Sequence, residues 1–168
     1  MIITLTGFMG SGKSSVGRWL SELLCCPFMD LDAVIEESQG RSIPEIFAAE
    51  GEAAFRQMEV EALSRIIEAQ QLRGNVVVAL GGGAVMTPEC AELVRKKTHC
   101  IYLRASVDTL VSHLENEAAG RPMLQGASLR SRIEELMALR SSTYEATAHD
   151  VIDTDGKTVE EVAAEIKF

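Results

Sequence analysis

Residues 7–14 read GFMGSGKS and match the pattern G-x-x-x-x-G-K-[ST]. Residues 2–6 are apolar or β-branched, which predicts a short buried strand, and apolar residues recur at helical intervals after the glycines. Between a strand and a helix, such a loop gathers backbone N–H groups and the positive end of the helix dipole around a phosphate. A glycine-rich turn that matches by chance would not need these flanks. We therefore expect a nucleotide-binding P-loop.

Two side chains of this loop indicate how a nucleotide would be held. Lys13 is placed to reach the β- and γ-phosphates of ATP. The Ser14 hydroxyl is a ligand for Mg²⁺ in this pattern. The predicted cofactors are therefore ATP and Mg²⁺.

Strand and helix patterns alternate along the whole chain. The predicted strands cover residues 2–6, 27–30, 75–80, 100–103 and 150–153. The predicted helices cover residues 33–38, 43–49, 52–70 and 129–144, with others after residue 14, from about residues 88 and 107, and at the C-terminus. Such alternation implies a parallel sheet covered on both faces, whose ligands bind beyond the carboxyl ends of the strands.

Composition favours a single cytoplasmic domain. The 168 residues carry a formal charge of −9, which makes nucleic acids and anionic membranes poor partners. No segment is long and apolar enough to span a membrane, and the first strand begins at the N-terminus, so we expect no signal peptide. The cysteines have neither C-x-x-C nor metal-ligand spacing, which is typical of reduced thiols. We expect a monomer.

Two loops at the predicted strand ends carry unusual residues. Asp30 and Asp32 end the second strand, and side chains two apart on a strand share a face, so both carboxylates could point toward the phosphate site. One would hold the Mg²⁺ hydration shell and the other a substrate hydroxyl; the alternative is a helix N-cap beside a solvated acid. Gly81, Gly82 and Gly83 follow the third strand and would let a ligand lie against the backbone, unless they only form a tight turn.

Three arginines supply a further signal in this acidic chain. Arg140 lies on or beside the apolar stripe of its helix, and Arg56 lies just inside the start of a long helix. Arg121 begins the sequence RPML in an irregular segment of about residues 115–128. Each alone would suit a solvated surface. Together with a phosphate loop they indicate a site for anionic ligands.

The chain resembles the shikimate kinase family over essentially its full length. The matching stretches are GFMGSGKSS, FMDLD, GRSIPEIFAAEGEAAFRQME, LGGGAV, RPML and LMALRSSTY. The resemblance implies an α/β fold of the P-loop NTPase type, similar to nucleoside monophosphate kinases. It would have three αβα layers, a five-stranded parallel sheet in the order 2-3-1-4-5 and a lid. It also implies transfer of the γ-phosphoryl group of ATP to the 3-hydroxyl of shikimate, on the pathway to aromatic amino acids.

Carried over by position, the resemblance assigns a role to each candidate residue of the single domain 1–168. The ATP phosphates would be bound by Gly10, Ser11, Gly12, Lys13, Ser14, Ser15 and, from a lid of about residues 115–128, Arg121. Shikimate would be bound by Asp32, Arg56, Gly82 and Arg140, with a helical segment of about residues 33–59. Ser14 would bind Mg²⁺ directly and Asp30 through its outer shell. Lys13, Asp32 and Arg121 would be catalytic, with Asp32 holding the acceptor hydroxyl and taking its proton.

Two places depart from the family's pattern. Family members usually carry an arginine or lysine that stacks on adenine about seven residues before the Arg-Pro of the lid, and this chain has His113 and Leu114 there. The loop at residues 154–157, which approaches adenine in the family, is short. Because imidazole is a poor substitute for a stacked guanidinium, we expect replacement of His113 by alanine to matter little.

The phosphate loop is also compatible with another small-molecule P-loop kinase or, from a different class, with a nucleotide-dependent switch or ATPase module. A P-loop kinase for gluconate or a nucleoside monophosphate would share the loop and lid, but it gives no reason for the acid pair, the triple glycine and Arg140 together. A GTPase switch would need N-K-x-D, and neither Asn75 nor Asn116 is followed by lysine. A motor-type ATPase would need a strand that ends in Asp-Glu, and no aspartate here is followed by glutamate.

Overall fold

The computed structural model describes residues 1–115 and 128–167. Its sheet has the predicted order, β2-β3-β1-β4-β5, with every pair of neighbours parallel. The strands are β1 (Ile2–Thr6), β2 (Phe28–Asp30), β3 (Val76–Ala79), β4 (His99–Arg104) and β5 (Asp150–Asp153). The predicted α/β fold with a parallel sheet is confirmed.

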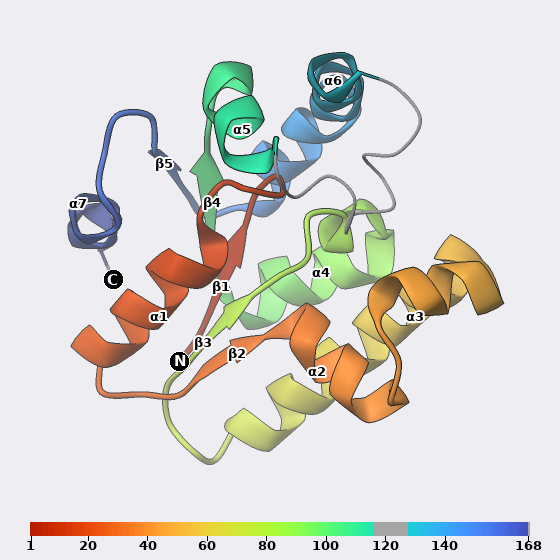
Figure 1. Ribbon diagram of the computed structural model, residues 1–168. Helices are drawn as coiled ribbons and strands as arrows, with labels where there is room; N and C mark the ends of the chain where they lie inside the picture. Colours follow the sequence, from red (N-terminus) through yellow and green to blue (C-terminus); the bar gives the residue numbers. More distant parts are fainter. Residues whose placement is uncertain (116–127, 168) are drawn as a thin grey trace.

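Helices cover both faces of this sheet (Figure 1). One face is covered by α1 (Lys13–Leu23) and α7 (Val159–Glu165), and the other by α3 (Ile43–Gln70), α4 (Pro88–Lys97) and α6 (Leu129–Thr147). Ile3 and Leu5 of β1 pack toward the first face and Ile2 toward the second, as the alternation of a strand requires. Burial on both sides explains why β3 reads as an unbroken apolar run.

The remaining helices frame the carboxyl ends of the strands. They are α2 (Leu31–Gln39), which packs against α3, and α5 (Val107–Leu114), which packs against α6. A short 3₁₀ helix, η1 (Ala84–Met86), follows β3 and was not predicted. The two helices predicted at residues 43–49 and 52–70 are the two parts of α3, which breaks at Gly51 with φ +85°. Within the described ranges, no helix combines the length and apolar character needed to cross a bilayer.

One local prediction was wrong. β2 ends at Asp30 and α2 begins at Leu31, so Asp32 lies in the first turn of a helix rather than on a strand. The Asp30 carboxylate causes this early turn, because its Oδ1 accepts hydrogen bonds from the backbone N–H of Asp32 at 3.0 Å and of Ala33 at 3.2 Å. The alternative interpretation, a helix N-cap, is therefore correct for Asp30.

Candidate active site

The phosphate loop lies between β1 and α1, as predicted. Gly10 and Gly12 have φ of +79° and +93°, the left-handed region that glycine adopts without strain. Gly12 is the N-cap of α1 and offers no side chain to cap it, which leaves the first N–H groups of this helix for a ligand. Lys13 Nζ donates to the carbonyls of Gly7 at 2.8 Å and Phe8 at 3.0 Å, so its charge lies over the loop.

A cleft of about 430 Å³ extends from this loop to the end of β3. Its walls are Met9, Gly10, Gly12, Lys13, Ser14 and Ser15 from the loop and α1, then Asp30, Asp32, Ala33 and Glu36 from β2 and α2, and Leu80, Gly81 and Gly82 after β3. Five of the predicted phosphate residues and both predicted aspartates therefore share one cleft, whereas Ser11 is buried and does not line it. Although the strand argument for Asp32 was wrong, its expected place beside the phosphate loop is correct.

Ser14 and Asp30 meet at the floor of the loop. Ser14 Oγ donates to Asp30 Oδ2 at 2.9 Å, while the other carboxylate oxygen caps α2. A hydroxyl beside a carboxylate offers the hard oxygen donors that Mg²⁺ prefers. The residues present therefore fit the predicted metal.

The end of the cleft at the triple glycine, Gly81 to Gly83, is where the phosphoryl acceptor is expected to bind, and we call it the acceptor end. A Cβ at Gly81 would lie 2.8 Å from Asp32 Oδ1 and 3.0 Å from Glu59 Oε2, so a larger residue here would displace these carboxylates. At Gly83 a Cβ would overlap the guanidinium of Arg56. These two glycines leave room for charged side chains from α2 and α3, a role that was not predicted from the sequence, where they were expected to let a ligand lie against the backbone.

Arg140 approaches the same place from α6. Its residue is 4% exposed, and Nη1 would lie 3.6 Å from a Cβ at Gly82. The Tyr144 hydroxyl, one turn later, donates to the Gly82 carbonyl and ties α6 to this loop. Asp32, Arg56, Gly82 and Arg140 are thus brought together as predicted, although Arg121 and most of the predicted lid lie outside the described residues.

Three polar atoms at this end have no hydrogen-bond partner among the described residues. They are Asp32 Oδ1, Glu59 Oε2 and Arg140 Nη1, each buried from solvent. A buried polar atom without a partner costs about 1–3 kcal/mol, so folded proteins keep few of them. Their concentration around one loop indicates that a polar ligand completes the site.

Burial also raises the pKa values of the Asp32 and Glu59 carboxyls. Removal from water raises the pKa of Asp32, and the nearby charge of Asp30 raises it further, against the opposing effects of Lys13 and Arg56. A carboxylate with a raised pKa is a stronger base. Burial likewise raises the pKa of Glu59 to about 7, although Arg56 opposes the shift.

Glu59 is the functional residue that sequence reasoning missed. Its Oε1 accepts a hydrogen bond from Arg56 Nη1 at 2.7 Å, which holds the guanidinium at the triple glycine. Glu59 follows Phe55 and precedes Leu63 on the buried face of α3. A charged residue within an apolar stripe is the same signal that singled out Arg140, and it would have found Glu59 too.

A phosphate loop with buried polar side chains beside the neighbouring triple glycine, at the carboxyl ends of a parallel sheet, is the arrangement that a P-loop kinase for a small molecule requires. A shikimate kinase family model matches residues 9–167. The chain is 45% identical to a shikimate kinase of Geobacter metallireducens, over 98% of this chain and 88% of that protein. It is 42% identical to one of Chlorobium chlorochromatii, over 99% and 90%. The chain belongs to the shikimate kinase family.

Solved structures agree with this assignment. A shikimate kinase from Acinetobacter baumannii in complex with shikimate superposes with a TM-score of 0.91 at 33% identity, covering 98% of this chain and 89% of that one. A gluconokinase from Sinorhizobium meliloti reaches a TM-score of only 0.54 at 20% identity, a likeness of fold alone. The gluconate alternative is not favoured.

Proposed function

We propose that this protein transfers the γ-phosphoryl group of ATP to the 3-hydroxyl of shikimate, giving shikimate 3-phosphate, with the residue roles set out below. Membership of the shikimate kinase family makes it an ATP-dependent phosphotransferase of aromatic amino acid biosynthesis. The observation that carries the acceptor assignment is the set of buried, unpartnered atoms on Asp32, Glu59 and Arg140. A molecule with one carboxylate and several hydroxyls offers suitable partners for all three.

Arg140 and Arg56 bind the carboxylate of the acceptor in this proposal. A guanidinium donates two parallel hydrogen bonds that match the geometry of a carboxylate. Arg140 Nη1 is buried without an acceptor among the described residues, whereas Arg56 is held in place by Glu59 and Glu52. Gly82 lies close to the phosphate loop, since a Cβ there would be 3.3 Å from the Met9 backbone nitrogen, and Gly81 and Gly83 leave room for Asp32 and Arg56.

Asp32 acts on the acceptor hydroxyl. Its raised pKa suits a group that orients the hydroxyl and takes its proton as the phosphoryl group is transferred. The transition state is loose, so catalysis depends mainly on positioning and on neutralising charge on the phosphoryl oxygens. Lys13 supplies one positive charge, and we assign a second to Arg121.

The phosphates of ATP bind along the P-loop. Gly10, Gly12, Lys13, Ser14 and Ser15 line this end of the cleft, and the first turn of α1 offers uncapped N–H groups. Ser11, the remaining predicted phosphate residue of the loop, is buried and does not line the cleft. Ser14 would hold Mg²⁺ directly and Asp30 through a water molecule. The bound ion would supply positive charge to the β- and γ-phosphates.

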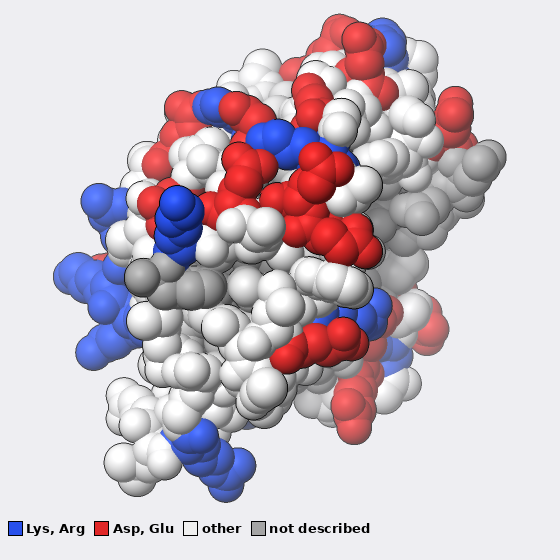
Figure 2. Space-filling view, turned by 90° about the vertical axis from the view of Figure 1, so that its left-hand side faces the viewer, with Lys and Arg blue, Asp and Glu red and all other residues white. Residues whose placement is uncertain are grey.

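The remaining parts of the proposal concern organisation and partners. α2 and the first part of α3, about residues 33–59, would form the acceptor-binding segment, and residues 115–128 a lid. We propose a monomeric cytoplasmic enzyme, supported by the family and by four free cysteines. Acidic side chains gather in the upper half of the face in Figure 2, which together with the net charge of −9 argues against a nucleic-acid partner.

A coupled assay of ADP release tests the function. With Mg²⁺ and ATP, we expect ADP release to require shikimate, while gluconate and nucleoside monophosphates support only background rates. Mass spectrometry of the product should show one phosphate added to shikimate. ADP release that proceeds equally without an acceptor would contradict the kinase assignment, and faster turnover of gluconate would contradict the choice of acceptor.

A further inference from the structure

The last turn of α5 touches the phosphate loop at Gly10. His113 Nδ1 lies 2.7 Å from the Gly10 carbonyl oxygen, although the two residues are 103 positions apart. The next residue, Leu114, also packs on Gly10, because a Cβ there would lie 2.8 Å from Leu114 Cγ. α5 therefore contacts Gly10 through a polar and an apolar side chain at once.

The polar contact fixes one peptide group of the loop. Because the Gly10 carbonyl only accepts, His113 must donate from a protonated Nδ1. The N–H of Ser11, in the same peptide plane, donates to the Phe8 carbonyl at 3.1 Å. The Gly10–Ser11 peptide is thus held on both sides. These two hydrogen bonds keep the Gly10 carbonyl oxygen from turning toward the phosphate. This matters because the partial negative charge of a carbonyl oxygen repels phosphate oxygens.

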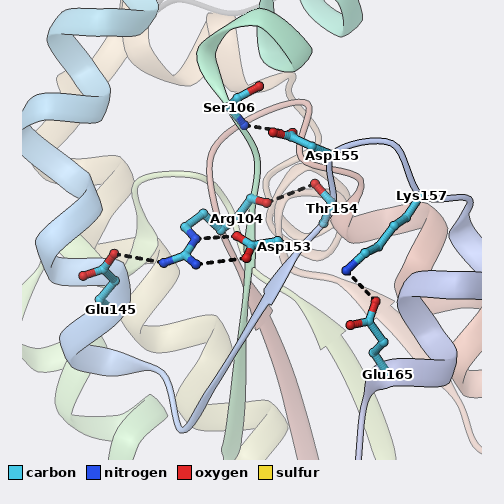
Figure 3. A network of polar contacts seen from close by, with 8 residues as sticks. All are labelled: Arg104, Ser106, Glu145, Asp153, Thr154, Asp155, Lys157 and Glu165. Atoms are coloured by element: carbon cyan, nitrogen blue, oxygen red, sulfur yellow. Dashed lines mark hydrogen bonds and ion pairs between the residues drawn. The ribbon is translucent and has the colours of Figure 1, made fainter.

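The other end of α5 is anchored as well. Ser106 is the N-cap of α5, and its backbone N–H donates to Asp155 Oδ1 at 3.0 Å (Figure 3). Thr154 Oγ1 donates to the Arg104 carbonyl at 3.1 Å, which ties the loop after β5 to the end of β4. A helix fixed at its start can hold His113 steadily against the phosphate loop.

We propose that His113 is a positioning residue for the phosphates of ATP. Through its hydrogen bond to the Gly10 carbonyl, it keeps the loop in the shape that presents the N–H groups at the start of α1. The inference rests on the proposed function, since the loop must bind ATP for this shape to matter. It replaces the sequence-based expectation that His113 is unimportant, because that expectation considered only the adenine ring.

The test compares two ligands that share phosphates but differ in the base. The Mg²⁺ complexes of ADP and of inorganic tripolyphosphate are titrated by calorimetry into the wild type, His113→Ala, His113→Asn and a control, Ser112→Ala. Ser112 is exposed on the same turn, and Ala suits a helix at either position. We expect His113→Ala to weaken both ligands by about threefold to tenfold, the usual value of one hydrogen bond.

The asparagine variant identifies the donor. Its Nδ2 can take the place of imidazole Nδ1, so we expect His113→Asn to bind both ligands within about twofold of the wild type. Shikimate affinity without nucleotide and the thermal midpoint should stay unchanged in all variants. In steady-state assays, we expect His113→Ala to raise KM for ATP and to leave kcat unchanged.

Three results would overturn the inference. Weaker binding of ADP with unchanged binding of tripolyphosphate would mean that His113 contacts the base instead. Asparagine as weak as alanine would exclude the donated hydrogen bond, and alanine equal to wild type would exclude any role. A wild type that bound neither ligand would instead refute the function proposed for the loop, so the two failures are distinguishable.

Discussion

The nucleotide end and the acceptor end of the cleft both bind anions in an acidic protein, but they are built differently. Under the proposed function, the nucleotide end uses backbone N–H groups and one lysine from a single stretch of chain, residues 7–15. The acceptor end collects Asp32, Arg56, Glu59 and Arg140 from three helices around the triple glycine. One end is local in the sequence and the other is assembled by the fold.

The two ends also differ in how many of their polar atoms have hydrogen-bond partners before a ligand binds. At the nucleotide end, Ser14 and Lys13 already have partners within the protein, and one buried polar atom of the loop, Ser11 Oγ, has none among the described residues. At the acceptor end, three buried polar atoms have none among the described residues. An acceptor that supplies those partners is favoured over one that lacks them, because unpaired groups are penalised most strongly when they are buried. Under the proposed function, selectivity for the acceptor would therefore arise at the assembled end.

Lys13→Met should have the largest effect. A neutral side chain cannot compensate the charge on the transferring phosphoryl group, so we expect kcat to fall by on the order of 10³–10⁵-fold, as when other phosphoryl-transfer cations are removed. Steady-state assays at saturating ATP and shikimate measure this. Shikimate binding without nucleotide should be retained. Turnover like that of the wild type would remove the loop from the mechanism.

Asp32→Asn should have the second-largest effect on turnover. Asparagine keeps the shape of the side chain but cannot take a proton, so we expect kcat to fall by roughly 10²–10⁴-fold. KM for ATP should change little. Glu37→Gln, an exposed acid on the same helix, is the matched control. If the loss appeared only in KM for shikimate, Asp32 would bind the acceptor without acting as its base.

Glu59→Gln should alter how stability depends on pH. The pKa of Glu59 rises from 4.5 to about 7 on folding, so between these values the folded state holds the extra proton. The free energy of unfolding must then fall as pH rises through this window. We expect the wild type to lose up to about 3 kcal/mol relative to Glu59→Gln between these limits.

Urea unfolding at several pH values measures this difference. Glu68→Gln, an exposed change on α3, should give a curve parallel to that of the wild type. Some pH dependence should persist in Glu59→Gln, because the pKa of Asp32 is also raised. Parallel curves for the wild type and Glu59→Gln would mean that burial does not perturb this carboxyl.

Arg140→Lys and Arg56→Lys should weaken shikimate binding by about 1.5–3 kcal/mol, because lysine keeps the charge but loses the paired hydrogen bonds. We expect the larger loss at Arg140, since the Arg56 guanidinium is already shared with Glu59. ATP binding should hardly change. Calorimetric titration of shikimate, with the exposed Arg65→Lys as control, decides the matter. Near-normal affinity in both would mean that the carboxylate is bound elsewhere.

Asp30→Asn should have the smallest effect. Asparagine caps helices as well as aspartate does, so α2 should remain stable. Without the charge beside Ser14, we expect half-maximal activity to need on the order of tenfold more Mg²⁺, the lower range for outer-shell groups. Titration of activity with Mg²⁺ measures this. An unchanged Mg²⁺ dependence, with loss of stability instead, would make Asp30 purely a helix cap.

Much of the nucleotide end could be predicted from sequence because its determinants are neighbours in the chain. The strand, the glycines and the first turn of α1 follow one another within residues 2–23, and each has a local signature. The five-stranded order came from the resemblance, since alternation alone gives a parallel sheet but not its order. Asp32 was misplaced because Asp30 turns the chain into a helix within one residue, with no glycine or proline to mark the change.

By itself, then, the sequence determined the phosphate loop and the alternating fold, and it singled out Asp32, Arg56 and Arg140 but not Glu59. Only the tertiary structure decided that Glu59 holds Arg56, that polar atoms of Asp32, Glu59 and Arg140 are buried together, and that His113 meets Gly10. The reason is physical. A loop conformation depends on backbone torsions of adjacent residues, whereas burial and a raised pKa depend on which distant side chains exclude water, and that follows only from packing.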